Sequence, residues 1–276
     1  RIKNAMTVGK NIVCFEELTS DDETTLREIA KSHNVTFVYK QSDSNFDDCA
    51  DLSEKNDVPV ISVLGMAESC SKFDAELSLY RILCDKGYKV SLVSSKSNVE
   101  LLGIQPFPSF MFSHHYSEIE KMNLFSNFVK NIIYHQRPDV IIIGIPGGII
   151  PFNKQHNMHY GITAYEVLSI IKPDYTIVNV WADYVQAAIL DDLVNICRYR
   201  YGIKINAIGV SNISIYNDHS TIERTHQEYN IYNLQYVDEK IASNGFTYFG
   251  GVKFYNILEK ASMERLADDA IEMLSE

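Results

Sequence analysis

Short apolar runs alternate with helical patterns along most of this chain, from Val58 to about Ile213. The run from Val140 to Ile145 is β-branched except at Gly144, which is typical of a strand that is buried on both faces. Strands that alternate with helices form parallel sheets with helices on both sides. We therefore predict an α/β fold with a doubly wound, mainly parallel sheet.

The expected strands of this sheet are 58–64, 88–94, 140–145, 175–180 and 207–213. Helices are expected at 73–86, 118–137, 160–172 and 185–201, and a last one near 254–274 with a break around Lys260. Parallel strands end at the same edge of a sheet, where such folds bind their ligands. Gly65, Ser94, Gly147 and Trp181 follow four of the strands, so we expect them to lie along one rim.

A smaller α/β part is expected ahead of this sheet. Residues 10–16 and 35–39 are strand candidates, and Ser20 with Glu23 three positions later predicts a helix that runs to about His33. Residues 41–57 are polar and acidic, which is typical of a linker or mobile loop. We thus predict an N-terminal part with its linker at 1–57 and a main domain at 58–276. Because the chain begins with Arg1 and residues 2–6 resemble a helix end, we expect a preceding segment.

Charge and composition restrict the partners. The formal net charge is -11 and the isoelectric point about 5.2, which argues against nucleic acid or an anionic membrane as the main partner. No apolar stretch approaches the ~18 residues that a membrane-spanning helix needs. The cysteines are odd in number and lie apart, which indicates reduced thiols in a cytoplasmic protein; they are Cys14, Cys49, Cys70, Cys84 and Cys197.

The loop after the first strand of the main domain has the layout of a phosphate site. A strand, a turn that begins at Gly65, and a helix with Lys72 on its first turn follow one another. Ser71 stands where a second glycine is expected, and Phe73 stands where a Ser or Thr would hold Mg²⁺. The loop is therefore either a degenerate nucleotide site or a strand–turn–helix corner that binds nothing.

Two motifs resemble the dethiobiotin-synthetase-like branch of P-loop proteins. Gly65, five residues and then Ser71-Lys72 resemble its G-x5-G-K loop, and residues 137–151 resemble its second motif, a buried strand followed by E-G-x-G-G and a proline. The resemblance covers roughly 58–213 and implies a P-loop NTPase-like fold with ATP or GTP as ligand. It implies nucleotide contacts by Gly65, Cys70, Ser71, Lys72, Phe73, Gly147 and Gly148.

The second motif departs from the branch at one position. Gly144 stands where the branch has a glutamate, and glycine has no side chain to coordinate Mg²⁺. Together with Phe73, this argues against ordinary Mg-nucleotide chemistry, so no metal is firmly implied. Asp183 could substitute from a neighbouring loop, although an Asp there also suits a helix cap. Asp139 lies at the start of its strand, at the wrong end of the sheet.

Further segments resemble a clostridial family of peptide maturation system proteins, which are encoded beside radical-SAM enzymes and small precursor peptides. They are residues 86–91, 101–103, 107–112 and 9–14. This resemblance implies natural-product peptide biosynthesis in a bacterium, with the precursor peptide and a radical-SAM-type maturation enzyme as partners. We predict an accessory or binding protein; the alternatives are an ATP-dependent ligase- or kinase-like enzyme that acts on the peptide, and a scaffold for the maturation enzyme.

Three other features have competing interpretations. His114-His115, and His156 with His159, could bind a metal, but surface histidines are commoner. Cys70 lies near a helix N-terminus that would stabilise a thiolate, yet no base is placed beside it, so a small buried side chain is the simpler reading.

Aromatic residues raise two further alternatives. Residues 106–112 form either a peptide-binding groove or, more simply, a loop that covers the core at the sheet edge, because its prolines disfavour a central strand. The tyrosines of 216–236 suit a recognition surface and a homodimer interface equally.

Overall fold

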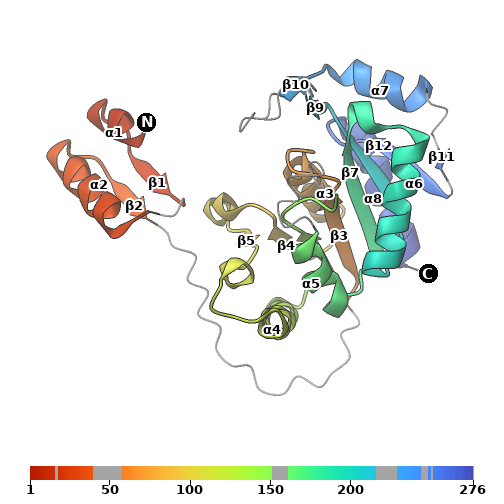
Figure 1. The fold of residues 1–276 in the computed structure, drawn as a ribbon, viewed down its shortest axis with the longest axis horizontal. Coiled ribbons are helices and arrows are strands. Elements are labelled where there is room, and N and C mark those ends of the chain that lie inside the picture. Colours follow the sequence, from red (N-terminus) through yellow and green to blue (C-terminus); the bar gives the residue numbers. More distant parts are fainter. Residues whose placement is uncertain are drawn as a thin grey trace. The chain divides into compact units, whose positions relative to one another are not determined.

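The computed structural model describes residues 1–15, 18–39, 58–150, 161–215, 229–243, 248–249 and 251–275. The chain divides into two compact units, Arg1–Asn45 and Phe46–Glu276 (Figure 1). The predicted linker at 41–57 lies outside the described residues. None of the described helices is long and apolar enough to cross a membrane.

The N-terminal unit is a small α/β structure. It comprises α1 (Ile2–Thr7), β1 (Ile12–Cys14), α2 (Ser20–Ser32) and β2 (Phe37–Tyr39), and its two strands pair in parallel. Met6, Leu26 and Ala30 form its buried core. The α2 cap is one residue earlier than predicted: the Thr19 hydroxyl accepts from the Asp22 backbone N–H at 3.1 Å. Thr and Ser cap helices by the same bond, so the sequence alone leaves this choice open.

A parallel sheet forms the centre of the second unit. Its described strands run in the order β11-β12-β8-β7-β3-β6-β4-β5, and every adjacent pair is parallel except β11 with β12. The strands are β3 (Val60–Gly65), β4 (Val90–Ser94), β5 (Gln105–Pro106), β6 (Val140–Gly144), β7 (Tyr175–Trp181), β8 (Ala207–Ser211), β11 (Tyr248–Phe249) and β12 (Val252–Asn256). This topology confirms the predicted α/β, doubly wound and mainly parallel fold.

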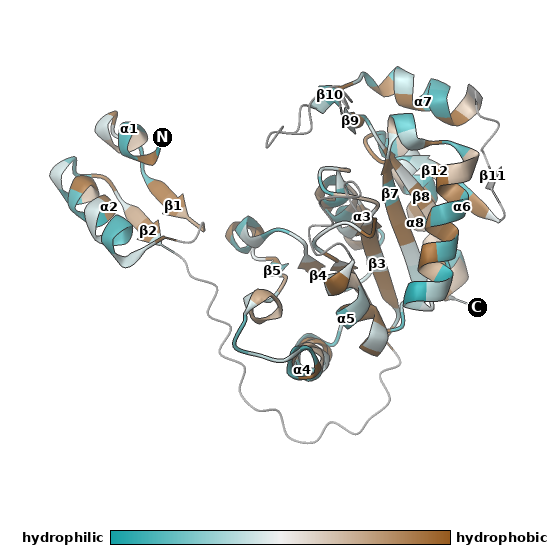
Figure 2. Cartoon of the chain, viewed as in Figure 1, coloured by the Kyte–Doolittle hydropathy of each residue, from teal (hydrophilic) through white to brown (hydrophobic). Residues whose placement is uncertain are grey.

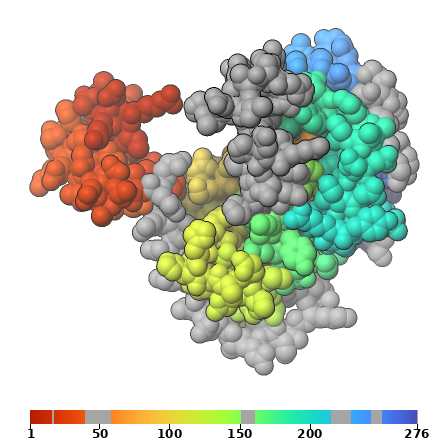
Figure 3. Space-filling model, viewed as in Figure 1, coloured from red at the N-terminus to blue at the C-terminus, as the bar shows by residue number. Residues whose placement is uncertain are grey.

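Helices cover both faces of the sheet. Helices α3 (Lys72–Asp85) and α8 (Lys260–Leu274) pack on one face, and α4 (Glu118–Gln136), α5 (Ile162–Ile170) and α6 (Ala187–Ile196) pack on the other. In the space-filling view, α4 and α5 appear in yellow-green and green on the same side of the molecule (Figure 3). The remaining described elements are short: η1 (Ser97–Leu102), η2 (Ser109–Phe112), η3 (Ala182–Tyr184), the π-helix η4 (Cys197–Tyr201), the β9–β10 hairpin (Ile213–Ile215, Tyr229–Ile231) and α7 (Leu234–Ser243).

Alternation along the central strands builds the two cores. In β3, Ile61 and Val63 face α3 and α8, whereas Val60 and Leu64 face the opposite layer. Successive strand side chains point to opposite faces, so a strand that is covered twice is apolar throughout. The brown colour of β3 and β7 shows this pattern (Figure 2). Each fully buried Val, Leu or Ile contributes about 1.5–3 kcal/mol of transfer free energy.

The C-terminal prediction was wrong in one part. Residues 254–256, which we expected to begin the last helix, belong to β12, and the helix starts only at Lys260. Phe254 and Tyr255 are buried on opposite faces of the sheet, and β12 pairs with β8 in parallel. Residues 254–256 form a strand because they pair with β8, which is distant in the sequence. The local pattern of apolar residues cannot show such a pairing.

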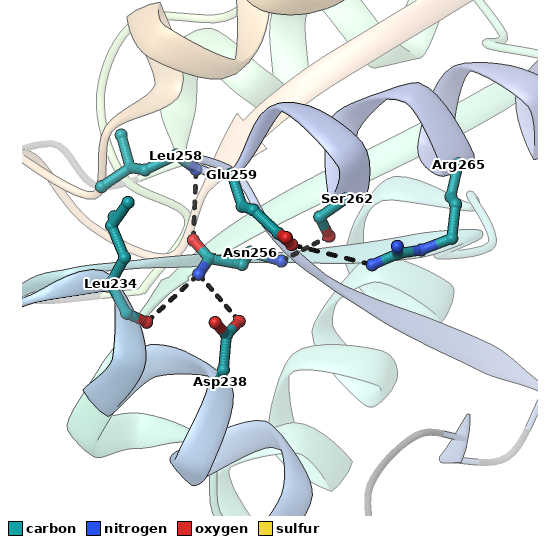
Figure 4. Close-up of polar contacts among 7 residues, drawn as sticks. All are labelled: Leu234, Asp238, Asn256, Leu258, Glu259, Ser262 and Arg265. Carbon is teal, nitrogen blue, oxygen red and sulfur yellow. Dashed lines mark hydrogen bonds and ion pairs between the residues drawn. The ribbon is translucent and has the colours of Figure 1, made fainter.

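Asn256 joins three elements at the end of β12. Its side-chain amide donates to the Leu234 carbonyl and the Asp238 carboxylate, and its side-chain oxygen accepts from the Leu258 N–H at 3.2 Å (Figure 4). Its backbone N–H donates to the Ser262 hydroxyl at 3.0 Å. Asn256 therefore holds the start of α7 and the first turn of α8 against the sheet.

The aromatic segment covers the core at the β5 edge. Phe107, Phe110 and Met111 are buried, and the ring of Phe107 lies 5.3 Å from that of Phe125 on α4. Phe112 is 54% exposed, so it is the aromatic residue of this segment that faces outward. The structure agrees with the simpler interpretation, a loop that closes the core.

Candidate functional site

The four strand ends singled out from the sequence lie along one rim of the sheet. Strands β4, β6, β3 and β7 are consecutive neighbours and run in parallel, so Ser94, Gly65 and Trp181 share that rim. Gly147 follows the end of β6 by three residues and contacts Lys72 on the neighbouring loop. The prediction is confirmed, and the rim is the candidate site.

The loop between β3 and α3 adopts an unusual backbone conformation. Ser69 and Ser71 have φ of 57° and 54°, in the left-handed region that glycine normally occupies. Ser71, which stands at the second glycine of the P-loop pattern, therefore holds a conformation that favours glycine.

Side chains of β7 fix the carbonyl groups of this loop. The Asn179 side chain donates to the Cys70 and Ser71 carbonyls at 3.2 and 3.1 Å, and the Trp181 indole donates to the Ser69 carbonyl at 3.3 Å. In a trans peptide the N–H points opposite to the C=O. The N–H groups of residues 70–72 therefore point away from the β7 side chains. Those of Ser71 and Lys72 donate to no acceptor within the described residues.

Gly65 leaves space within the loop, and Gly148 lets the second motif pack on it. A Cβ at Gly65 would lie 2.4 Å from the Cys70 sulfur, and a Cβ at Gly148 would lie 2.6 Å from the Ala67 Cα. The backbone N–H of Ile149 donates to the Gly65 carbonyl at 3.0 Å. The structure thus brings together Gly65, Cys70, Ser71, Lys72, Gly147 and Gly148.

Lys72 places a cation at this rim. It is 7% exposed and its ammonium donates to the Gly147 carbonyl. Gly147 has φ of 84°, in the left-handed region that favours glycine. An ammonium has three N–H donors, so one bond to Gly147 leaves two for an anion. Phe73, the next residue, is half-buried and has no metal-binding oxygen in its side chain.

Cys70 packs as a small apolar side chain. It is fully buried, and its sulfur donates to the Ala67 carbonyl at 2.9 Å. Burial raises the pKa of the Cys70 thiol, and the nearby charge of Lys72 opposes that shift. The simpler reading of the sequence holds, because a buried neutral thiol is a poor nucleophile. No disulfide joins the cysteines of the described segments, which are Cys14, Cys70, Cys84 and Cys197.

Glu76 is the functional candidate that the sequence analysis missed. It is fully buried, and its carboxylate accepts from the Ser94 hydroxyl at 2.6 Å and from the Ser95 hydroxyl and N–H at 2.6 and 3.1 Å. Burial raises the pKa of the Glu76 carboxyl, and the serine hydrogen bonds and the Lys72 charge oppose this. A signal was present: Glu76 lies four residues after Lys72, on the same helix face, within a buried stripe.

The carboxylate of Glu76 occupies the space beside Gly144. A Cβ built on Gly144 would lie 2.1 Å from Glu76 Oε1 and 2.7 Å from Oε2. A side chain at position 144 and the observed position of Glu76 therefore exclude each other. The rim has a carboxylate where the second motif lacks one, and it comes from helix α3.

Asp183, the substitute considered from the sequence, is engaged elsewhere on the rim. Its carboxylate accepts from the Tyr236 hydroxyl at 2.6 Å and from the Tyr232 hydroxyl at 3.1 Å. Partial burial alone would raise the pKa of Asp183, but hydrogen bonds from Ser214, Tyr236 and Tyr232 outweigh it and lower the pKa. The two tyrosine rings stack with their centres 4.2 Å apart. Asp183 thus anchors α7 and the hairpin.

Of the two histidine clusters, only His114-His115 lies within the described residues. His114 and His115 are exposed, and no group of three or more His, Cys, Asp or Glu side chains that could hold a metal occurs within the described residues. His156 and His159 lie outside those residues.

No protein-family model and no curated protein matches this sequence. Among solved structures, a DUF1611 family protein from Anabaena variabilis ATCC 29413 is similar with a TM-score of 0.59 at 11% identity, over 98% of this chain and 74% of that protein. At 11% identity this similarity shows the α/β fold alone.

Two nucleotide complexes show weaker similarity. A plasmid partition protein from Borrelia burgdorferi B31 bound to AMPPNP has a TM-score of 0.46 at 14% identity, over 79% of this chain and 98% of that one. Cobyrinic acid a,c-diamide synthase from Mycobacterium smegmatis with bound ADP and magnesium has a TM-score of 0.45 at 11% identity, over 79% and 96%. At these identities the similarity concerns the fold alone.

Proposed function

We propose that the chain binds the phosphates of a nucleotide, ATP or GTP, at the loop of residues 65–72. The observation that carries the proposal is the orientation of this loop. Asn179 and Trp181 hold its carbonyl groups, and the N–H groups of Ser71 and Lys72 point the other way. Backbone N–H groups, a helix N-terminus and a lysine together favour a phosphate.

We further propose that the chain serves as an accessory or binding protein in the maturation of a ribosomally synthesised peptide. This rests on the resemblance of residues 86–91, 101–103 and 107–112 to peptide maturation system proteins. Its partners would be the precursor peptide and a radical-SAM-type maturation enzyme. Nucleotide binding would then set the affinity for one of these partners, because a ligand can couple to a second site through differential affinity.

A thermal-shift titration with ATP, GTP and ADP tests the nucleotide site. Binding stabilises the folded chain by about 2.7 kcal/mol at a ligand concentration 100 times the Kd. Lys72→Ala should remove the shift, because it removes the cation at the loop. Lys204→Ala, at an exposed lysine, is the control and should keep it. An unchanged shift in Lys72→Ala would place the nucleotide elsewhere.

Glu76 favours the second candidate function, an ATP-dependent enzyme that acts on the peptide. The carboxylate that the second motif lacks at Gly144 is present on α3, beside that position. Transfer of a phosphoryl group needs a metal and a group that positions the nucleophile. Turnover of MgATP in the presence of the precursor peptide and the maturation enzyme separates this candidate from the accessory role.

A further inference from the structure

Three oxygen groups meet beneath the first turns of α3. They are the carboxylate of Glu76 and the hydroxyls of Ser94 and Ser95, with both O···O distances to the carboxylate at 2.6 Å. Ser94 ends β4, the neighbour of β6, so the cluster lies at the carboxyl rim. Lys72 is one helical turn before Glu76 and close enough for its charge to act on that carboxylate.

The cluster contains what the two motifs lack. Phe73 removes a hydroxyl and Gly144 removes a carboxylate, relative to the P-loop pattern. Glu76 returns a carboxylate to the space beside Gly144, because a Cβ there would lie only 2.1 Å from its Oε1. Ser94 and Ser95 return hydroxyl groups beside that carboxylate. Oxygen groups of Glu76, Ser94 and Ser95 are therefore present although the two motifs lack a hydroxyl at Phe73 and a carboxylate at Gly144.

Glu76 places a carboxylate where the rest of the buried helix face is mainly apolar. Burial of a carboxylate costs several kcal/mol even when hydrogen bonds compensate part of it. An apolar side chain at position 76 would extend the stripe that Leu79 and Leu83 form on the same helix. Glu166, another buried glutamate, lies on α5, which packs on the opposite face of the sheet from α3, and the charges of Lys121 and Glu118 act on it.

We propose that Glu76, with Ser95 and Ser94, supplies the protein ligands for a divalent cation that binds together with the nucleotide phosphates. The inference rests on the proposed function. Carboxylate and hydroxyl oxygens are the hard ligands that Mg²⁺ prefers, and Mg²⁺ is usually held by one or two carboxylates plus phosphate oxygens and waters. A hydroxyl can donate one hydrogen bond while its lone pairs accept, so Ser95 can keep its bond to Glu76 and also face a cation.

Calorimetric titration of ATP, with Mg²⁺ and with EDTA, measures the cation's contribution. The wild-type chain should bind ATP more tightly with Mg²⁺. Glu76→Gln keeps the shape of the side chain and an acceptor for the serines but removes the charge. It should reduce the Mg²⁺ effect about tenfold or more, and leave affinity in EDTA within about threefold. Glu166→Gln, the matched buried control, should retain the full effect.

Two further variants test the role of the Glu76 carboxylate through residues of other elements. Gly144→Ala introduces a Cβ that must displace Glu76, so it should also weaken the Mg²⁺ effect. Ser95→Ala removes one hydroxyl at a half-buried position and leaves the bond from Ser94, so it keeps the test valid if Glu76→Gln fails to fold. Electron paramagnetic resonance of Mn²⁺ with ATP gives a second readout, the amount of protein-bound cation.

The outcomes separate the two proposals. Equal ATP affinity with Mg²⁺ and with EDTA in the wild-type chain, or a full Mg²⁺ effect in Glu76→Gln, would overturn the cation site and leave the nucleotide site standing. Absence of ATP binding under both conditions would overturn the nucleotide site and, with it, the cation site. A loss of Mg²⁺ effect in Glu166→Gln equal to that in Glu76→Gln would also contradict the inference.

Discussion

The Asn179 side chain holds the backbone of the β3–α3 loop, in which Ser71 stands where the P-loop pattern has its second glycine. Its amide holds the Cys70 and Ser71 carbonyls, and Ser71 keeps a left-handed backbone without being glycine. The Asn179 oxygen has no hydrogen-bond partner within the described residues and faces Gly209, whose Cβ would lie 2.2 Å from it. A buried, unpaired oxygen costs about 1–3 kcal/mol. The loop is therefore held in place at some cost to stability.

Cys70 allows a direct test of this packing. Because burial shields its thiol and raises the pKa, Cys70 should react with iodoacetamide more slowly in the folded chain than Cys84, which is exposed. Mass spectrometry of the alkylated peptides measures each rate. In denaturant the two rates should become similar. Faster alkylation of Cys70 than of Cys84 in the folded chain would contradict the buried position and revive the nucleophile hypothesis.

The sequence alone predicted only some of the residues of this site. The pattern predicted Gly65, Lys72 and Gly148, because each stands at a motif position and the motifs meet at one rim. The spacing of Glu76 from Lys72 places it on the same helix face, but nothing local shows that Gly144 is its neighbour. The contact depends on how α3 crosses the end of β6, which is a property of tertiary structure.

At the scale of elements, the segment after β6 packs directly on the β3–α3 loop. Gly148→Ala would place a methyl carbon 2.6 Å from the Ala67 Cα, which is backbone and cannot rotate away. We expect a loss of about 1–3 kcal/mol in the free energy of unfolding, measured by urea denaturation. Gly103→Asn is the control, because its left-handed φ suits Asn and nothing lies within 4 Å. Equal stability of Gly148→Ala and the wild type would refute this packing.

Element boundaries show where local patterns fail. Strands with two buried faces, such as β3 and β6, were predicted within two residues, because their composition is apolar throughout. β12 was assigned to a helix, since Phe254 and Tyr255 precede a genuine helical stripe and only pairing with β8 makes them a strand. The edge strand β5 and helix α7 have weak patterns of their own and were not predicted.

At the scale of the whole molecule, the order of strands and helices fixed the fold class before any motif was considered. Alternation implies parallel strands, and parallel strands bring their carboxyl ends to one rim. That is why Gly65, Ser94 and Trp181 could be placed together from the sequence. The chemistry at that rim was harder to predict, because its carboxylate and hydroxyls come from α3 and β4 and lie outside the motif positions.

Catalysis is a property of the whole rim, and we expect no appreciable ATP or GTP hydrolysis by the isolated chain. A cation at Glu76 would neutralise phosphate charge, but turnover also needs a group that positions the nucleophile. Asp183, another carboxylate at the rim, accepts hydrogen bonds from Tyr232 and Tyr236. Phosphate release should therefore stay at background with Mg²⁺ and nucleotide, for the wild type and Lys72→Ala alike.

The same assay with the precursor peptide and maturation enzyme asks whether a partner completes the rim. Under the accessory role, the partners should change nucleotide affinity without producing turnover that depends on Lys72. Magnesium-dependent turnover by the purified chain, lost in Lys72→Ala, would overturn that role. It would then make Glu76 and the serines beside it part of a working phosphoryl-transfer site, because those groups lie next to Lys72 at the start of α3.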